Sequence, residues 1–461
     1  MDSQPHNHLS ITCLPFPTPG HMNPMIDTTR LFARHGVNVT IIATPANAFA
    51  FPKAIDSDFS FGYHIRTQLV PSPAAQVGLP EGVENMKDGT SQEILGRIYH
   101  GISVLRSLIE ILFQYLHPDC IVSDMVYPWT LESAAKLGIP RIFFYSSSYF
   151  ADCAAHSIRR HRPQKRLVSD TDKFTIPDFS HRIGMTRLQL TNWERVQCRS
   201  YGALYNSFQE LESECEQLHE RIVGIKSWNI GPVSAWVNKD DGEMVKRKHR
   251  EDLPEEPEWL TWLNTEQNES VIYVNFGSLT RLPHAQLVEL AYGLQHYGHS
   301  FIWVMRKKDG SENEDSFLQE FEDNMKESRK GFSVWNWAPQ QLILNHPAIG
   351  GFVTHCGWNS ILESLNAGLP IITWPMFAEQ FFNERLLVDV LKIGVLVRAK
   401  ENKFWAFSGK DDVVGREKMA NVVVQLMEKE EGKEMRRRAR KLSDASKKTI
   451  EKGGHSYNNL I

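Results

Sequence analysis

Long apolar runs are missing from this sequence of 461 residues. No segment approaches the roughly 20 consecutive apolar residues that a membrane-spanning helix needs. Residues 1–10 are polar and lack the charged start and apolar centre of a secretory signal. We therefore expect a cytoplasmic protein without a membrane span.

The sequence also has few cysteines and only a small excess of negative charge. The six cysteines form no Cys-X-X-Cys pair, and so few in a chain of this length do not form the framework of a disulfide-stabilised domain. The net charge of −4 gives no reason to expect a nucleic acid or an anionic membrane as a partner. A reducing compartment fits these absences.

What the chain does contain is an alternation of short apolar runs with helical segments. In the first half, strands are predicted at 9–16, 37–43, 120–123 and 141–145, and helices at 25–34 and 129–136. In the second half, strands are predicted at 270–276, 300–304, 332–335, 351–354 and 370–374, with helices at 285–295 and after residues 359 and 380. Such alternation forms parallel sheets with crossover helices, so the sequence predicts an α/β fold.

The chain is too long for one ordinary hydrophobic core, so two domains are expected. Residues 234–256 are polar and charged, with proline near their end, which suits an interdomain linker. This places one domain at 1–233 and a second at 257–445. Ligands of open parallel sheets bind beyond the carboxyl ends of the strands, so the loops at those ends are where chemistry is expected.

The strongest motif spans 44 residues, from Trp337 to Gln380. A strand is predicted to end at Thr354, Gly357 permits a tight turn, and a helix is predicted to start at Asn359 or Ser360. The N-terminus of a helix has free backbone N–H groups that bind anions, so this turn suits a diphosphate.

Taken singly, the residues of this motif also have structural interpretations. Ser360 and Glu363 have the spacing of a capping box, in which Glu363 would only accept a backbone hydrogen bond. His355 could be a structural histidine, and Trp337 and Trp374 could be core residues. The single residues therefore leave both interpretations open.

The complete pattern resembles, position by position, the signature of plant secondary-product UDP-glycosyltransferases, and the chain is identified as a member of that family. The resemblance extends over nearly the whole chain. It implies two Rossmann-like domains that face each other across a cleft (the GT-B fold), the first binding the acceptor and the second a UDP-sugar. It implies a monomeric hexosyltransferase that needs neither a prosthetic group nor a metal ion.

The resemblance implies roles for the residues that bind uridine. Trp337 is expected to stack on the uracil, and Ala338 to offer backbone hydrogen bonds to its edge. Gln340 and Glu363 are expected to bind the ribose hydroxyls, for which a carboxylate accepting from two adjacent hydroxyls is apt.

The remaining motif residues are expected to hold the diphosphate and the sugar. The diphosphate is assigned to His355, Gly357, Trp358, Asn359 and Ser360, and the sugar to Trp374, Glu379 and Gln380. Upstream, Ser278 in Asn275-Phe276-Gly277-Ser278 is expected to lie near the phosphates; Asn275 stands where serine is commoner in the family. Gln380 suggests UDP-glucose as the donor, with UDP-glucuronic acid or UDP-galactose as alternatives.

A second motif places His21 after the first predicted strand, and Asp124 follows the strand at 120–123. Both therefore lie at the carboxyl edge of the sheet, although each alone could be structural, Asp124 as a helix cap. A carboxylate beside an imidazole fixes its tautomer and stabilises the imidazolium, as a general base requires. In the family this pair is the catalytic dyad, and both positions match.

The implied mechanism is a direct displacement with inversion. His21 removes the proton from an acceptor hydroxyl as its oxygen attacks the anomeric carbon. Asp124 offsets the positive charge on the ring, and UDP departs from the opposite face. The product is a β-glycoside.

The acceptor is expected to contact residues 94–113, 144–156 and 185–193, whose apolar and aromatic side chains favour a lipophilic molecule. Residues 15–47, 201–237 and 279–283 are similar to legume enzymes that glycosylate triterpenoid saponins. A triterpenoid aglycone or saponin is therefore expected, with a flavonoid or another phenolic as the alternative.

Two segments differ from the family pattern. Residues 193–201 are short for a helix that borders the acceptor, and residues 446–461, expected to return to the N-terminal domain, stop before the relatives' final helix. The alternative they raise is an impaired family member that binds UDP-sugar without turnover. A nicotinamide-dependent dehydrogenase, which also uses parallel sheets, is disfavoured because no Gly-X-Gly-X-X-Gly follows the opening strand.

Overall fold

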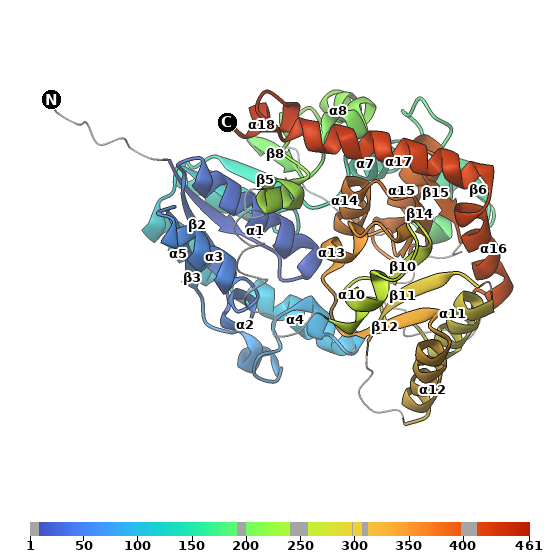
Figure 1. The fold of residues 1–461 in the computed structure, drawn as a ribbon. Coiled ribbons are helices and arrows are strands. Elements are labelled where there is room, and N and C mark those ends of the chain that lie inside the picture. The colour runs from blue at the N-terminus through green and yellow to red at the C-terminus, as the bar shows by residue number, and fades with distance from the viewer. Residues whose placement is uncertain (1–8, 191–199, 240–256, 297, 307–311, 398–412) are drawn as a thin grey trace. The chain divides into compact units, whose positions relative to one another are not determined.

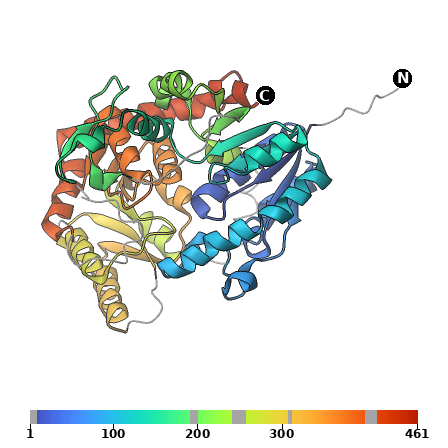
Figure 2. The ribbon, with the colours of Figure 1, turned by 180° about the vertical axis from the view of Figure 1, so that it is seen from behind.

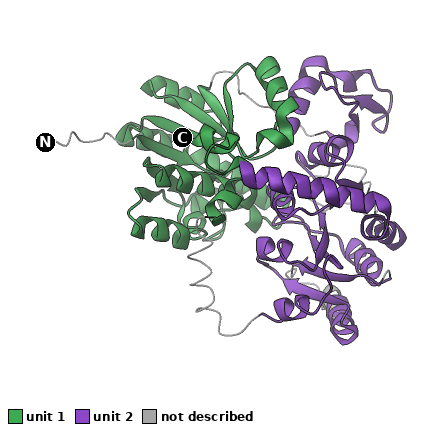
Figure 3. Ribbon diagram, turned by 45° about the horizontal axis from the view of Figure 1, so that its top comes forward, with its two compact units in different colours: residues 1–149, 193–240, 449–461 green, residues 150–192, 241–448 purple. Residues whose placement is uncertain are grey.

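The computed structural model describes residues 9–190, 200–239, 257–296, 298–306, 312–397 and 413–461. These form two compact units (Figure 3). Unit 1 comprises Met1–Tyr149, Trp193–Asp240 and Thr449–Ile461, and unit 2 comprises Phe150–Asn192 and Asp241–Lys448. Residues 150–192, which the sequence placed in the first domain, thus group with the second unit.

Unit 1 is built on a seven-stranded sheet whose paired strands are all parallel, in the order β3-β2-β1-β4-β5-β8-β9. The strands are β1 (Ser10–Leu14), β2 (Asn38–Ala43), β3 (Ile65–Leu69), β4 (Cys120–Asp124), β5 (Arg141–Tyr145), β8 (Gly202–Tyr205) and β9 (Ser227–Asn229). The strand order reverses between β1 and β4, and such a switch point is where open α/β sheets bind ligands.

Helices cover this sheet, and Figures 1 and 2 show them from opposite sides, with α4 and α5 in front of the strands in Figure 2. They are α1 (Pro19–Arg34), α2 (Pro45–Ala48), α3 (Pro52–Ser60), α4 (Gln92–Val104), α5 (Arg106–Leu116), α6 (Thr130–Leu137), α8 (Gln209–Val223) and α18 (His455–Leu460). In α1, Met22, Met25 and Ile26 are buried at helical spacing, so one face of the helix packs into the core.

Two predictions about unit 1 need correction. Helix α1 begins at Pro19, not after Pro24, because a proline in the first turn costs no hydrogen bond and its fixed φ suits the helix. His21 therefore lies in the first turn of a helix. The predicted linker at 234–256 also begins too early: residues 233–239 are helical, with Trp236 and Val237 buried in the core of unit 1, and residues 240–256 lie outside the described part.

Unit 2 has a six-stranded parallel sheet in the order β12-β11-β10-β13-β14-β15. The strands are β10 (Val271–Asn275), β11 (Ser300–Met305), β12 (Gly331–Trp335), β13 (Ile349–Thr354), β14 (Ile371–Thr373) and β15 (Gly394–Leu396), and a separate antiparallel pair is formed by β6 (Lys173–Thr175) and β7 (Gly184–Thr186). Strands β10, β13 and β14 are buried almost throughout, as expected of a parallel sheet covered on both faces.

The helices of this half begin with α7 (Tyr149–His161), whose first residue belongs to unit 1. The others are α10 (Glu258–Leu263), α11 (His284–His296), α12 (Glu312–Ser328), α13 (Gln340–Leu344), α14 (Trp358–Ala367), α15 (Gln380–Arg385), α16 (Arg416–Met427) and α17 (Glu430–Thr449), with a π-helical turn at Leu386–Val390. Among the described residues, no helix combines the length and the apolar character that crossing a lipid bilayer requires.

The chain returns to unit 1 after α17. In α18, Ser456 donates from Oγ to the Gly231 carbonyl at 2.7 Å, and Asn459 donates to the Asn229 carbonyl at 2.9 Å. The Tyr457 ring stacks on Trp236 with ring centroids 5.8 Å apart. Helix α18 is thus an integral part of unit 1.

Candidate active site

His21 and Asp124 meet at the carboxyl edge of the unit 1 sheet. Strand β4 pairs with β1 through Leu14 and Ser123, so α1, which follows β1, starts beside the end of β4. His21 Nδ1 lies 2.9 Å from Asp124 Oδ2 and 3.1 Å from Oδ1. Asp124 is fully buried and also accepts a hydrogen bond from the Val126 backbone N–H at 3.0 Å.

This contact fixes the tautomer of the histidine. An ionised carboxylate only accepts hydrogen bonds, so Nδ1 carries the proton and Nε2 keeps a lone pair. The His21 side chain is 17% exposed, and its ring meets Phe16 edge to face with centroids 5.4 Å apart. The arrangement can remove a proton from a hydroxyl group brought to Nε2.

Ser146 is a second polar neighbour of this histidine, and the sequence analysis did not predict their contact. Its Oγ lies 2.9 Å from His21 Nδ1, and it follows directly after β5, the neighbour of β4. The rule that ligands gather beyond strand ends, which singled out His21 and Asp124, applies to Ser146 equally.

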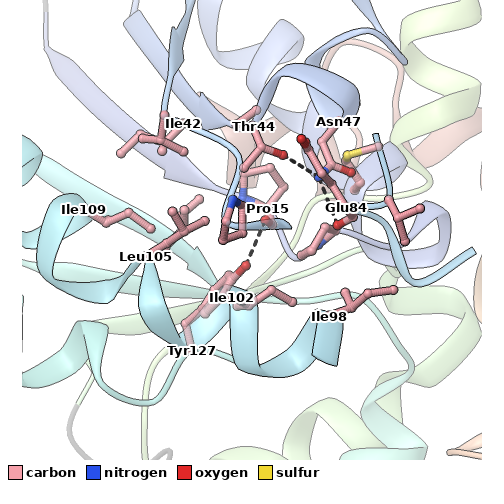
Figure 4. Close-up of a pocket in the computed structure, with 18 of the residues that line it drawn as sticks. Pro15, Ile42, Thr44, Asn47, Glu84, Ile98, Ile102, Leu105, Ile109 and Tyr127 are labelled. Carbon is pink, nitrogen blue, oxygen red and sulfur yellow. Dashed lines mark hydrogen bonds between the residues drawn. The ribbon is translucent and has the colours of Figure 1, made fainter. Parts of the chain in front are cut away.

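Unit 1 also contains an apolar cavity of about 50 Å³ near α1 (Figure 4). One side is lined by Ile98 and Ile102 of α4 and by its C-terminal cap, Leu105, all within the segment 94–113 that was expected to contact the acceptor. The lining includes no residue of 144–156 or 185–193. The polar groups at its edge are already paired: Asn47 donates to Thr44 Oγ1 at 2.8 Å, and Tyr127 to the Pro15 carbonyl at 3.3 Å.

In unit 2, the motif begins with an exposed tryptophan. The Trp337 side chain is 76% exposed and follows Asn336, whose φ of +67° turns the chain sharply at the end of β12. Ala338 is buried, and α13 starts at Gln340. An exposed indole just beyond a strand end offers a free face for stacking.

Gln340, Ser360 and Glu363 are brought together from α13 and α14. Gln340 donates from Nε2 to Glu363 Oε2 at 2.6 Å and to Ser360 Oγ at 3.1 Å. Gln341 donates to the other Glu363 oxygen at 3.1 Å. Burial raises the pKa of Glu363, while the two amide donors act against that rise.

This geometry decides against the capping-box interpretation of Ser360 and Glu363. The N-cap of α14 is Gly357, so Ser360 lies inside the helix. Glu363 accepts from side chains of α13 instead. Gly357 has no capping side chain, and the first turn of α14 holds no acidic residue, so no carboxylate in that turn offsets the positive end of the helix. In this turn Trp358 is buried, and Asn359 and Ser360 are partly exposed.

His355 sits between two glycines. A Cβ at Gly277 would lie 2.5 Å from His355 Cε1, and one at Gly357 would lie 2.4 Å from Nε2 of the same ring. The backbone therefore passes directly against the imidazole at both glycines. Burial lowers the pKa of His355 from 6.5 to about 4, so the imidazole is neutral near pH 7. Ser278 follows Gly277 and is partly exposed in the turn after β10.

The residues that are expected to contact the sugar lie in the segment after β14. The Trp374 side chain is only 3% exposed and meets Phe276 edge to face at 5.4 Å, and its backbone N–H donates to the Thr354 carbonyl. Gln380 is buried and accepts at Oε1 from the Met376 and Phe377 backbone N–H groups at 2.9 and 3.0 Å. Glu379 is the partly exposed N-cap of α15.

Two Rossmann-like α/β units define the GT-B class of glycosyltransferases. The family model described as UDP-glucoronosyl and UDP-glucosyl transferase matches residues 110–402. The chain belongs to this family, and it is a UDP-glycosyltransferase. The fold class and the enzyme class predicted from the sequence are thereby confirmed.

Individual proteins are similar to this chain over nearly its whole length. The chain is 51% identical to the soyasapogenol B glucuronide galactosyltransferase of Glycine max, covering 97% of this chain and 93% of that protein. It is 40% identical to the scopoletin glucosyltransferase of Nicotiana tabacum, over 96% and 94%. Among solved structures, Glycyrrhiza uralensis UGT73P12 complexed with glycyrrhetinic acid 3-O-monoglucuronide matches with a TM-score of 0.90 and 46% identity, over 98% and 94%.

Proposed function

We propose that this enzyme transfers a hexose from a UDP-sugar to a hydroxyl of a triterpenoid aglycone or of its glycoside. The observation that carries the proposal is the 51% identity, over nearly the whole chain, to a protein named for a triterpenoid glucuronide acceptor. The likeness to UGT73P12, solved with a triterpenoid monoglucuronide, supports the same acceptor class.

The proposed chemistry uses the His21–Asp124 pair. His21 Nε2 takes the acceptor proton as the acceptor oxygen attacks the anomeric carbon, and the bond from that carbon to the UDP oxygen breaks. Asp124, 2.9 Å from Nδ1, stabilises the imidazolium that forms. Attack from the face opposite UDP inverts the configuration.

In this proposal unit 2 binds the donor. Trp337 stacks on the uracil, with Ala338 at its edge, and Gln340 and Glu363 hold the ribose. The uncapped start of α14, with His355 and Ser278, holds the diphosphate. Trp374, Glu379 and Gln380 are assigned to the sugar, with UDP-glucose as the first candidate and UDP-galactose and UDP-glucuronic acid as the others.

Unit 1 binds the acceptor in this proposal. Phe16 contacts both His21 and Tyr99, and Tyr99 is 41% exposed. The Tyr99 ring, which packs on the buried Phe16 ring that contacts His21, gives an apolar polycyclic skeleton an exposed surface near the proposed base. A flat phenolic acceptor is the second candidate, favoured by the 40% identity to a scopoletin glucosyltransferase. We further propose that the enzyme acts as a cytoplasmic monomer.

The test is mass spectrometry of purified protein incubated with each of the three UDP-sugars and a panel of triterpenoid aglycones, triterpenoid monoglucuronides, flavonoids and coumarins. We expect a product heavier by one hexose with a triterpenoid. Products with phenolic acceptors alone would move the assignment to the second candidate. A folded protein that binds UDP but gives no product would contradict the proposal.

A further inference from the structure

Asn275, the last residue of β10, makes three hydrogen bonds that link strand, turn and helix. Its Oδ1 accepts from the Gly277 backbone N–H at 2.9 Å. Its Nδ2 donates to Gln340 Oε1 at 2.7 Å and to the Tyr273 hydroxyl at 3.0 Å. A side chain with separate donor and acceptor ends is needed to make all three.

The direction of this chain of hydrogen bonds is determined at its start. A backbone N–H can only donate, so the oxygen of the Asn275 amide must face Gly277 and its nitrogen must face Gln340. Gln340 therefore presents its oxygen to Asn275 and its nitrogen to Glu363, where it donates at 2.6 Å. The Tyr273 hydroxyl, 3.3 Å from the same Gln340 oxygen, adds a second donor to it.

The orientation of Gln340 matters because the opposite one is unfavourable. With the amide turned over, its oxygen would face the Glu363 carboxylate, and two acceptors at hydrogen-bond distance repel each other. Glu363 would then also lose the donor from Gln340 that opposes the effect of burial on its pKa. Asn275 makes no contact with Glu363 itself but determines which end of Gln340 the carboxylate meets.

We propose that Asn275 is a positioning residue for the donor nucleotide: through Gln340 it orients the Glu363 carboxylate that receives the ribose hydroxyls. This inference depends on the proposed function, in which Gln340 and Glu363 bind the ribose. It adds a residue that touches no part of the nucleotide in that assignment.

The experiment compares the affinities of UDP and 2′-deoxyuridine diphosphate, measured by titration calorimetry, since their ratio reports on the ribose hydroxyl alone. Asn275→Asp keeps the shape and the acceptor for Gly277 but replaces the donor to Gln340 with an acceptor; Asn275→Ala removes both. We expect each variant to reduce the preference for UDP by about fivefold or more, the effect of one lost hydrogen bond. The kcat at saturating UDP-sugar should change much less than the donor KM.

Two further variants make the result decisive. Asn345→Ala removes another asparagine that donates to α13, at the Gln341 carbonyl, and it should leave the ratio unchanged. Glu363→Ala should abolish the preference. If Glu363→Ala does so and both folded Asn275 variants keep the wild-type ratio, the positioning role is refuted and the ribose assignment stands. If Glu363→Ala also keeps it, the ribose assignment itself fails.

Discussion

At the scale of single residues, the His21 imidazole is oriented by its Nδ1 contacts with Asp124 and Ser146. Asp124 is completely buried, and a buried carboxylate is stable only when its hydrogen bonds are satisfied. The contacts from His21 and the Val126 N–H supply them. The dyad is therefore held rigidly before any substrate binds.

We expect His21→Ala to lower kcat by about 10²–10⁴-fold, the usual contribution of a general base. The affinity for UDP should stay within about twofold, because His21 has no part in the proposed donor contacts. UDP release assays and calorimetric titration with UDP measure the two quantities. Unchanged turnover would contradict the mechanism, and a large loss of UDP affinity would contradict the separation of roles.

His355 is expected to make stability depend on pH. Its pKa is about 4 in the folded protein against an ordinary value of 6.5, so between these values the unfolded chain binds the extra proton. Stability is therefore lost as pH falls from about 6.5 to about 4. The free energy of unfolding, measured by chemical denaturation, should fall between pH 7 and pH 5 by about 1–2 kcal/mol less in His355→Asn than in the wild type. Equal losses in the two proteins would refute this.

At the scale of elements, the turn after β10 is built around one glycine. Gly277 has a φ of +75° and leaves no room for a Cβ against His355. Gly277→Ala should destabilise the protein and lower UDP affinity by about tenfold or more, because either the turn or the imidazole must move, and a move of about 1 Å is enough for such a loss.

Gly298 provides the matched control for this turn. Its φ is +72°, yet a Cβ there would meet nothing within 4 Å. Gly298→Ala therefore carries the left-handed strain of about 1–2 kcal/mol without touching His355. Its UDP affinity should equal that of the wild type in calorimetric titration; a similar loss in both variants would mean that strain alone explains the effect.

Most elements could be predicted because buried parallel strands appear as short apolar runs. The strand at 141–145 matches β5 in full, and that at 120–123 differs from β4 only by Asp124. The start of α1 was missed because the helix was predicted to begin only after Pro24, whereas Pro24 lies inside it. The helix at 233–239 was missed because its neighbourhood is polar, while its burial depends on Tyr457, far along the chain.

At the scale of the whole molecule, the last helix is part of the first unit's core. Deleting residues 455–461 removes one hydrogen bond to β9 and one to the turn that follows it. It also removes the stacking of Tyr457 on Trp236. We expect this to cost about 3 kcal/mol and to lower the melting temperature, with faster hydrogen exchange in β9. UDP affinity below the melting range should be unchanged. An unaltered melting curve would contradict the prediction.

The predicted short segment at 193–201 falls mostly on residues 191–199, outside the described part of the chain. The predicted domains at 1–233 and 257–445 differ from the observed units in residues 150–192. A linear sequence shows where elements begin and end, but the unit to which a segment belongs depends on the contacts it makes.

The sequence by itself determined the α/β class, which follows from apolar periodicity, and the family, which is indicated by the resemblance of the motif from Trp337 to Gln380. Only the tertiary structure decided how the residues of that motif pair. Gln340 meets Asn275 across 65 positions and Glu363 across 23, and Ser146 reaches His21 across 125. Contacts over such separations arise from the order of strands in the sheet, and a helix-capping pattern such as Ser360 to Glu363 gives no sign that its carboxylate is bound elsewhere.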